Sequence, residues 1–347
     1  MEMQIKTRPA WPLKAAILVA ALCALLLAAW LLWPESSPPA LPQAEVSPVA
    51  LSSEPILPLP DSIPGLDPQK VALGNTLFHD TRLSHDNTIA CATCHRLDQG
   101  GIDGRQYPIG IKGQVAETNV PTVFNSAFNF RQFWNGRAAT LEDQAAEVII
   151  NPLEMGSSWV EVMAKLKQDA GYAASFSQIY NNGITPGNIV DAIATFERTL
   201  LTPNARFDKY LKGDDQAITA YELAGYKLFK SYGCISCHQG RNIGGNFYEK
   251  LGVMRDYFKE RGAITAAGQG RYAITQNPDD MHKFKVPSLR NVALTAPYFH
   301  DGTIKTLEQA VIAMGEYQLG LSLPEEDVAR IVAFLRTLTG EYNGQPL

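Results

Sequence analysis

Two copies of one five-residue motif constrain this chain more than any other feature. Cys-x-x-Cys-His occurs at Cys91–His95 and again at Cys234–His238. The spacing places two thiols one helical turn apart, where they can add across the two vinyl groups of a haem, and the next residue offers an imidazole to the iron. A zinc site or a thioredoxin-like pair does not require a His after each second Cys. The motifs therefore predict two covalent c-type haems, held by Cys91, Cys94, Cys234 and Cys237, with His95 and His238 as proximal ligands.

Composition narrows the class of protein. A chain of 347 residues is long enough for two domains, and its two motifs lie in different halves. The net charge of −5 argues against nucleic acid as a partner. Four of the five cysteines belong to the motifs, so no disulfide framework is expected. Because haem c is attached outside the bacterial cytoplasm, the haem domains are expected in the periplasm.

The N-terminal region contains an apolar run from Ala15 to Trp33. Its length is close to the roughly 20 residues that cross a bilayer, and the positive side chains before it predict a cytoplasmic segment 1–14. We therefore expect a single-pass anchor in the inner membrane at residues 15–33, with Cys23 as a buried thiol. A cleaved signal peptide is the alternative, although its apolar core usually spans only about 7–15 residues.

The rest of the chain divides by composition into three segments. Residues 34–64 are rich in Pro, Ser and Ala, which predicts an extended periplasmic tether. Two cytochrome-c-like domains are expected to follow, at residues 65–205 and 206–347, each with one motif. The segments Val71–Phe78 and Leu223–Phe229 form a weak internal repeat, with apolar residues at helical spacing around a Gly.

The predicted fold class is mainly α, with long loops that wrap the haems. No series of strands with regular spacing occurs in the sequence. Amphipathic periodicity and capping residues predict helices at Leu141–Ile150, Ser158–Gln168, Pro186–Thr199, Leu307–Met314 and Glu325–Leu338.

Beyond the haem motifs, short segments resemble the bacterial dihaem cytochrome c peroxidase family and its relatives that oxidise protein side chains. The resemblance covers about residues 66–340, in family order. Besides the haem motifs, the matching segments are Arg82–Ser84, Gly100–Gly104, Asn119–Thr122, Phe133–Arg137, Asn151–Gly156, Val286–Asn291 and Ala296–Gly302.

The resemblance implies different tasks for the two haems. The haem at His95 would react with peroxide, and the haem at His238 would receive and store electrons. Met314 matches the position of the sixth ligand of the second haem, and a thioether ligand raises the reduction potential. Met281 is the competing candidate, and a Met at an apolar helix position is otherwise a core residue.

Three further side chains are implied around the haems. Glu154 matches the family's catalytic acid, which moves a proton between the two oxygens of peroxide. Gln144 matches the amide that orients peroxide or water. Trp134 matches the indole that lies between the haems and carries electrons, although a core aromatic ring would give the same sequence.

The resemblance also implies a calcium ion between the two domains and a tendency to dimerise. Asn119, Thr295 and Pro297 match the calcium ligands, partly through backbone carbonyls. Amide and carbonyl oxygens suit this hard ion.

One position departs from the family pattern. Many members carry a His that caps the resting peroxidatic haem and leaves on reduction, and Ile111 occupies that position here. Isoleucine cannot ligate iron, so either the haem is open at rest or His85 or His79 replaces the missing ligand.

The expected function is reduction of hydrogen peroxide to water with two electrons from a small cytochrome c, a copper protein or quinol. Two alternative functions are considered. A dihaem oxidase that modifies a partner protein is disfavoured, because the best-known enzyme of that kind has Tyr at the position of Met314. A plain electron carrier would need two six-coordinate irons and would have no use for Glu154.

Overall fold

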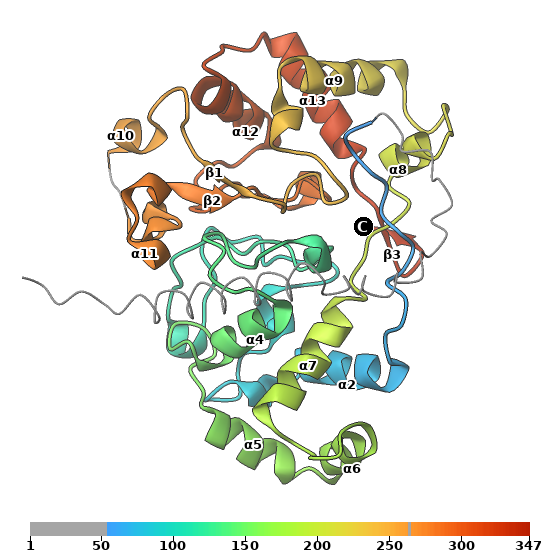
Figure 1. Ribbon diagram of the computed structural model, residues 1–347, viewed down its shortest axis with the longest axis vertical. Coiled ribbons are helices and arrows are strands. Elements are labelled where there is room, and N and C mark those ends of the chain that lie inside the picture. Colours follow the sequence, from blue (N-terminus) through green and yellow to red (C-terminus); the bar gives the residue numbers. More distant parts are fainter. Residues whose placement is uncertain (1–53, 263–264) are drawn as a thin grey trace, which may run out of the picture. The chain divides into compact units, whose positions relative to one another are not determined.

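The computed structural model describes residues 54–262 and 265–347 (Figure 1). The expected anchor at residues 15–33, Cys23 and most of the expected tether lie outside these residues. Among the residues that the structure describes, no helix is long and apolar enough to cross a membrane.

The described part of the chain is mainly helical, as predicted, with two short antiparallel strand pairs. The helices are α2 (Pro68–Phe78), α3 (Cys91–Cys94), α4 (Leu141–Ile150), α5 (Trp159–Lys167), α6 (Ala170–Ile179), α7 (Pro186–Glu197), α8 (Arg206–Leu211), α9 (Ala220–Ser231), α10 (Tyr257–Arg261), α11 (Tyr272–Thr275), α12 (Leu307–Ala313) and α13 (Glu325–Arg336). The strands are β1 (Tyr248–Lys250), β2 (Lys283–Lys285), β3 (Glu341–Tyr342) and β4 (Gln345–Pro346). Each helix predicted from periodicity is present, within a few residues at its ends.

Capping residues explain where several helices begin. Thr140 before α4, Thr219 before α9 and Thr306 before α12 each accept a hydrogen bond from the third backbone N–H of the helix. The acidic or amide side chain at that third position accepts one in turn from the backbone N–H of the Thr. These capping boxes satisfy backbone donors that a helix start otherwise leaves unpaired.

Two helix pairs form the frame of the fold, and a Gly lies at each crossing. A Cβ atom on Gly74 of α2 would lie 1.9 Å from the carbonyl oxygen of Ala192 in α7. One on Gly225 of α9 would lie 1.9 Å from the carbonyl oxygen of Arg330 in α13. Only Gly permits this approach, which explains the Gly at the centre of each copy of the internal repeat.

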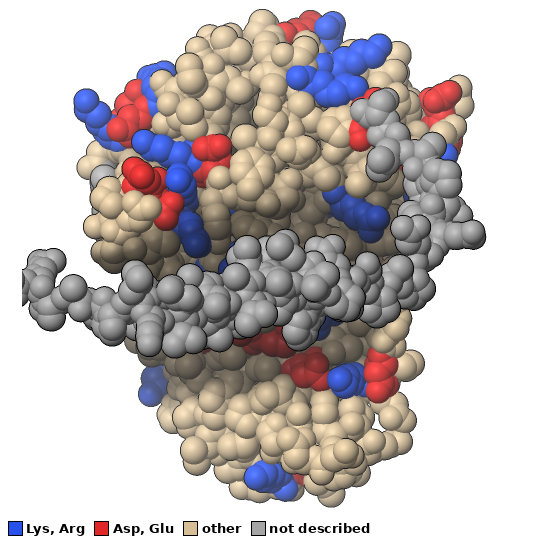
Figure 2. Space-filling view, viewed as in Figure 1, with Lys and Arg blue, Asp and Glu red and all other residues tan. Residues whose placement is uncertain are grey.

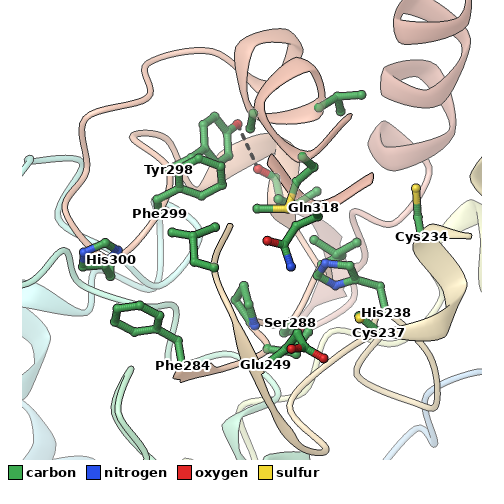
Figure 3. A pocket seen from close by; sticks show the side chains of 18 of the residues that line it. Cys234, Cys237, His238, Glu249, Phe284, Ser288, Tyr298, Phe299, His300 and Gln318 are labelled. Atoms are coloured by element: carbon green, nitrogen blue, oxygen red, sulfur yellow. Dashed lines mark hydrogen bonds between the residues drawn. The ribbon is translucent and has the colours of Figure 1, made fainter. Parts of the chain in front are cut away.

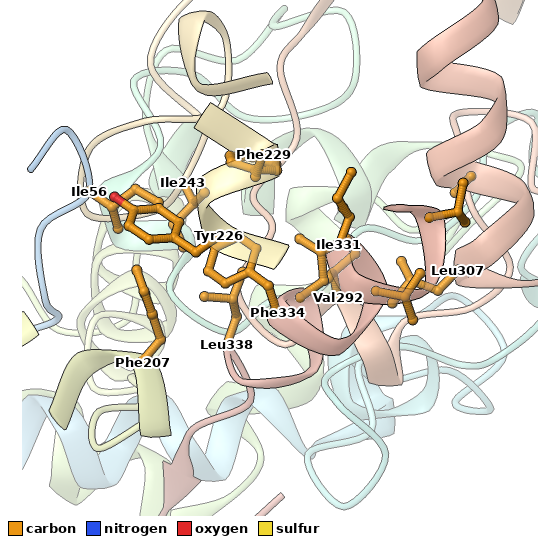
Figure 4. Close-up of a cluster of buried hydrophobic side chains, with 14 of the residues drawn as sticks. Ile56, Phe207, Tyr226, Phe229, Ile243, Val292, Leu307, Ile331, Phe334 and Leu338 are labelled. Atoms are coloured by element: carbon orange, nitrogen blue, oxygen red, sulfur yellow. The ribbon is translucent and has the colours of Figure 1, made fainter. Parts of the chain in front are cut away.

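The buried apolar residues gather in separate clusters along the sequence. One cluster draws on residues 73–193 and includes Leu77, Phe176 and Ile189. Another draws on residue 56 and residues 207–338, and Figure 4 shows Phe229, Phe334 and their neighbours in it. The predicted boundary between domains, at residues 205 and 206, stays a prediction, because residues 54–347 form one compact unit by their contacts.

The end of the expected tether is packed structure. Ile56 and Leu59 are buried, and Ile56 lies in the core with Phe207 and Tyr226 (Figure 4). The backbone of residues 55–57 exchanges hydrogen bonds with Gly240 at 2.9 and 3.3 Å. The Pro-rich composition predicted an extended segment, but the apolar residues inside it bury enough surface to order its last part.

The C-terminal residues pack against the core of the other half. Tyr342 of β3 meets the ring of Phe124 edge-on, with centroids 5.0 Å apart, and Leu347 contacts the same cluster. The backbone N–H of Glu341 donates to the carbonyl oxygen of Pro203 at 2.8 Å. On the face of the described residues seen in Figure 2, acidic and basic side chains are interspersed.

Candidate haem sites

The first motif folds as the short helix α3, which keeps the two thiols on one turn. The Nδ1 atom of His95 lies 3.1 Å from the carbonyl oxygen of Gly101. Since a carbonyl can only accept, Nδ1 carries the proton and Nε2 is left as the free ligand atom. Burial lowers the pKa of His95 and keeps the ring neutral, as a metal ligand must be.

The second motif repeats this arrangement. The Nδ1 atom of His238 lies 3.2 Å from the carbonyl oxygen of Ile243, so Nε2 is again free. Gly233 precedes the motif with a φ of 87°, a left-handed conformation that suits Gly. The two sites therefore fix their imidazoles in the same tautomer, although only the first motif forms an α-helical turn.

A cavity of about 510 Å³ opens beside the second motif. Figure 3 shows His238 and Cys237 at one side of it and Phe284 and His300 at the other. Its walls are mostly apolar and come from α9, α12, α13, β2 and the loop after β2. The volume and lining suit a large flat apolar group, which is what a haem requires of its pocket.

Met314 lines the same cavity as His238. It begins a π-helical turn, Met314–Leu319, that continues α12, and such turns concentrate at functional sites. Met281 is absent from the cavity lining. The structure thus brings Met314 and His238 to one cavity, and their joint ligation of iron stays a prediction.

The first motif lies among buried acidic groups. Glu154 Oε2 and Asp103 Oδ2 are both buried without a hydrogen-bond partner. Both carboxylates act on Cys94, whose pKa is raised first by burial and then by these two negative charges. Unpaired buried polar atoms around the thiols are expected where a further polar group belongs. The residues present at this motif therefore fit a covalent haem.

Glu154 is held by the backbone of its own loop. Its N–H donates to the carbonyl oxygen of Asn151 at 3.0 Å, directly after α4 ends. Burial, and less strongly the charge of Glu147, raise the pKa of Glu154 to about 7, while Arg137 opposes the shift. Arg137 forms an ion pair with Glu147 and stacks over Phe133 at 3.4 Å. A carboxyl group with this pKa can both accept and return a proton at neutral pH.

Ile111 packs tightly against the Glu154 loop. Its N–H donates to the carbonyl oxygen of Glu154 at 2.9 Å, and a Cβ atom on Gly156 would lie 2.2 Å from Ile111 Cδ1. Gln144 lies half-buried on α4, the helix that leads into this loop. Ile111 thus packs against the loop that carries Glu154.

His85 and His79, the two candidate replacements for the capping His, have other partners. His85 Nδ1 lies 3.0 Å from Glu161 Oε2, and the His85 side chain is 49% exposed. His79 Nδ1 lies 2.9 Å from the carbonyl oxygen of Asn75, at the exposed end of α2. Both imidazoles are engaged at the surface.

Trp134 and the three expected calcium ligands line the cavity beside the second motif. The indole N–H of Trp134 donates to the backbone carbonyl of Asn119 at 2.8 Å. The Asn119 amide donates to the carbonyl oxygen of Arg105 at 2.8 Å. Thr295 and Pro297 line the same cavity. The structure therefore brings Asn119, Thr295 and Pro297 together.

Sequence reasoning missed two buried residues of this cavity. His300 stacks on Phe284 with centroids 4.4 Å apart, and burial lowers its pKa to about 4. Lys285 is buried, and burial lowers its pKa to about 8. Lys285 follows Phe284 and His300 follows Phe299, and a polar side chain directly after a Phe was the only signal in the sequence.

Comparison with known proteins agrees with this geometry. A family model described as di-haem cytochrome c peroxidase matches residues 68–216. Cytochrome c peroxidase Ccp of Escherichia coli is 53% identical over 291 residues, which are 84% of this chain and 62% of that protein. The chain thus spans less than two thirds of this relative. Cytochrome c551 peroxidase of Nitrosomonas europaea is 44% identical over 297 residues, 84% of this chain and 86% of that protein.

Among solved structures, a MauG-like protein associated with microbial copper homeostasis is similar, with a TM-score of 0.72 and 29% identity. The similarity covers 89% of this chain and 96% of that one. Both haem motifs, their matching imidazole geometry and these relatives agree: the chain belongs to the di-haem cytochrome c peroxidase family.

Proposed function

We propose that this protein reduces hydrogen peroxide to water, at the first haem motif, with two electrons from an external donor. The observation that carries the proposal is the buried Glu154 carboxylate near the first motif, with one oxygen left unpaired. The peroxidase names of two long-matching relatives support the same activity. When bound, the haem at this motif supplies the iron that binds peroxide.

Glu154 moves the protons of the reaction. Its carboxylate would accept a proton from one oxygen of peroxide and return it to the other oxygen, which would leave as water. With a pKa of about 7, Glu154 populates both its carboxylate and its acid form near neutral pH, as the two transfers require. Gln144 is proposed to orient the peroxide, and Ile111 keeps the Glu154 loop in place.

His238, Met314 and Trp134 are proposed to serve electron supply. His238 and Met314 would hold the second haem, and a His together with a thioether favours the reduced state, which suits an electron store. The indole N–H of Trp134 donates to the carbonyl oxygen of Asn119, and the Trp134 and His300 ring centroids lie 6.4 Å apart. Trp134 is thus a fixed aromatic ring on the wall of the cavity beside the second motif. This position supports a role in passing an electron to the first haem.

The Met314→His variant tests the electron store. Imidazole favours ferric iron more than a thioether does, so the high-potential step is expected to move far down in a redox titration followed by absorbance. Met281→Leu is the matched control and should leave both steps in place. An unchanged titration in Met314→His would make Met314 a core residue.

A stopped-flow experiment tests the activity and the resting state together. With Ile111 in place of the capping His, the fully oxidised protein is expected to show a high-spin component and to react rapidly with peroxide without prior reduction. The half-reduced protein is the comparison, and His85→Ala is the control. A fully low-spin spectrum that becomes high-spin only in His85→Ala would show that His85 is the cap.

The remaining assignments are part of the same proposal. A cytochrome c is the proposed donor, because the Nitrosomonas relative is named for one. Calcium is proposed at Asn119, Thr295 and Pro297, supported by their shared place on the cavity wall. The periplasmic location, the inner-membrane anchor at residues 15–33 and a homodimer remain proposals from the sequence.

A further inference from the structure

A second buried carboxyl group belongs to neither the proposed mechanism nor the sequence predictions. Glu197, the last residue of α7, is 4% exposed, and its Oε2 atom has no hydrogen-bond partner. Burying such a group without a partner is costly, so it is retained where a neighbouring group needs it. The internal repeat shows where Glu197 lies, because α7 corresponds to α13 of the second half.

The helices α7 and α13 end on the same pattern, Ile-x-x-Phe-x-Arg-Thr-Leu, at residues 193–200 and 331–338. The pattern aligns Phe196 with Phe334, and both Phe residues contact the matching Gly of the partner helix. A Cβ atom on Gly74 would lie 2.8 Å from the Cβ atom of Phe196, and one on Gly225 would lie 3.1 Å from that of Phe334.

Ring contacts and helix ends confirm this register. The Phe78 and Phe196 rings have centroids 5.3 Å apart, and so do the Phe229 and Phe334 rings. The hydroxyls that follow also agree: Thr199 Oγ1 donates to the carbonyl oxygen of Phe196 at 2.7 Å. The corresponding hydroxyl in the second half, of Thr337, makes the same bond at 2.6 Å. The two helices are therefore structurally equivalent residue by residue.

This register pairs Glu197 with Leu335. Leu335 and Ile331 line the cavity of the second motif together with His238. Glu197 therefore occupies the wall position of the first haem site. An independent contact agrees: burial first, and the Glu197 charge second, raise the pKa of the Cys91 thiol. The first haem thus meets a carboxyl group where the second meets a leucine.

Two charged side chains act on the pKa of Glu197 besides burial. Glu142 on α4 repels it and Arg198 on its own helix attracts it, but these two form an ion pair at 2.6 Å. His79, near the end of α2, keeps its Nδ1 atom on the carbonyl oxygen of Asn75. Burial dominates and raises the pKa of Glu197 to about 8. The group is therefore mainly protonated at neutral pH and close to its titration.

We propose that Glu197, where its carboxylate form is populated, binds a proton when the first haem takes up an electron, so that electron arrival at this site is coupled to proton uptake at mildly alkaline pH. One electron from the donor reduces the iron, and one proton from solvent converts the Glu197 carboxylate to the acid. No bond other than the O–H bond forms. Reduction of the iron removes one positive charge from the haem beside Glu197. The affinity of the Glu197 carboxylate for a proton therefore rises.

The inference rests on the haem of the first motif and deepens the proposed function. Peroxide reduction consumes two protons with its two electrons, and Glu154 only relays a proton between the two oxygens. A site that takes up a proton with its electron stays close to electroneutral in a buried setting, where an uncompensated charge is costly. Glu197 would make the first haem, and not the second, respond to pH.

The test is a spectroelectrochemical titration of the full-length holoprotein at pH values on both sides of about 8, the pKa of Glu197. The wild-type potential of the first haem should fall as pH rises, by up to about 59 mV for each tenfold drop in proton concentration, the limit for one proton per electron. Glu197→Gln keeps the size of the side chain and Glu197→Leu copies the second site. Both should flatten this slope.

Three comparisons make the result decisive. The second haem, which meets Leu335, is the internal control and should show the smaller slope. Glu142→Gln and Glu154→Gln should keep the slope of the first haem. An unchanged slope in Glu197→Gln overturns the proposal, and so does a slope that Glu154→Gln alone removes. Peroxide turnover is measured separately, so a failure of the peroxidase assignment is distinguishable.

A spectroscopic measurement covers the case in which the variants lose haem. Reduction-induced infrared difference spectra of the wild type should contain the carbonyl band of a carboxylic acid, shifted in D₂O. The band should survive in Glu154→Gln, which assigns it away from that residue. Absence of any such band overturns the proposal without the use of a Glu197 variant.

Discussion

Peroxide turnover is expected to fall by about 10²-fold to 10⁴-fold when Glu154 is replaced by Gln, the usual contribution of a positioned acid–base group. The amide keeps the size of the side chain but cannot carry the proton. Haem content and both reduction potentials should stay close to wild type. The measurement is steady-state turnover with a reduced cytochrome c, together with the stopped-flow rate of the first step.

The pH dependence of peroxide turnover gives a second test of the role of Glu154. Taking the proton from peroxide requires the carboxylate form, so the wild-type kcat/KM should fall as pH drops below about 7, the pKa of Glu154. Glu154→Gln should lack this limb. Glu308→Gln, an exposed carboxylate paired with Arg336, is the matched control and should change neither rate nor profile. Turnover within threefold of wild type in Glu154→Gln would remove this residue from the mechanism.

The second large effect is on stability. Asp208 and Arg290 are both fully buried and joined at 2.6 Å. Asp208→Ala should lower the free energy of unfolding of the holoprotein by about 3–5 kcal/mol, because it leaves a guanidinium group buried without its carboxylate. Denaturant unfolding followed by circular dichroism measures the change.

The exposed pair Glu326–Arg330 of α13 provides the control. Glu326→Ala should change the free energy of unfolding by less than about 1 kcal/mol, since exposed ion pairs contribute little. If Asp208→Ala costs no more than this control, the buried pair is not a stabilising contact. Arg290 also donates to the carbonyl oxygens of Leu57 and Arg241, so replacing both partners with apolar residues should restore only part of the loss.

Local features of the chain were predictable from sequence alone. The helices α4, α5, α7, α12 and α13 follow from periodicity and from their capping residues, and each haem motif fixes its own loop. The π-helical turn at Met314 was not foreseen, because the pattern of α12 continues through it. The sequence also gave no local reason for Ile111 to pack on the Glu154 loop, which lies about 40 residues away.

Long-range contacts explain most of what was missed. The segment Val286–Asn291 carries family resemblance, but its local pattern does not show that Arg290 reaches Asp208 and Leu57. Composition likewise did not show that Ile56 and Leu59 at the end of the expected tether are buried. It indicates the entropic cost of ordering a segment but not the distant residues against which the segment packs. Glu197 escaped notice because a single Glu in an amphipathic helix is usually exposed.

The two ends of the described chain are exchanged between its halves. Ile56, near the beginning, completes the core built by residues 207–338, while Tyr342 and Leu347, at the end, pack on the cluster built around Phe78 and Phe124. Neither half can part from the other without first losing a piece of its own interior. Loosening of one half is therefore transmitted to the other, and both haem sites should be lost together on unfolding. During synthesis, residue 56 must wait for partners that emerge last, which delays completion of the fold until the whole chain is present.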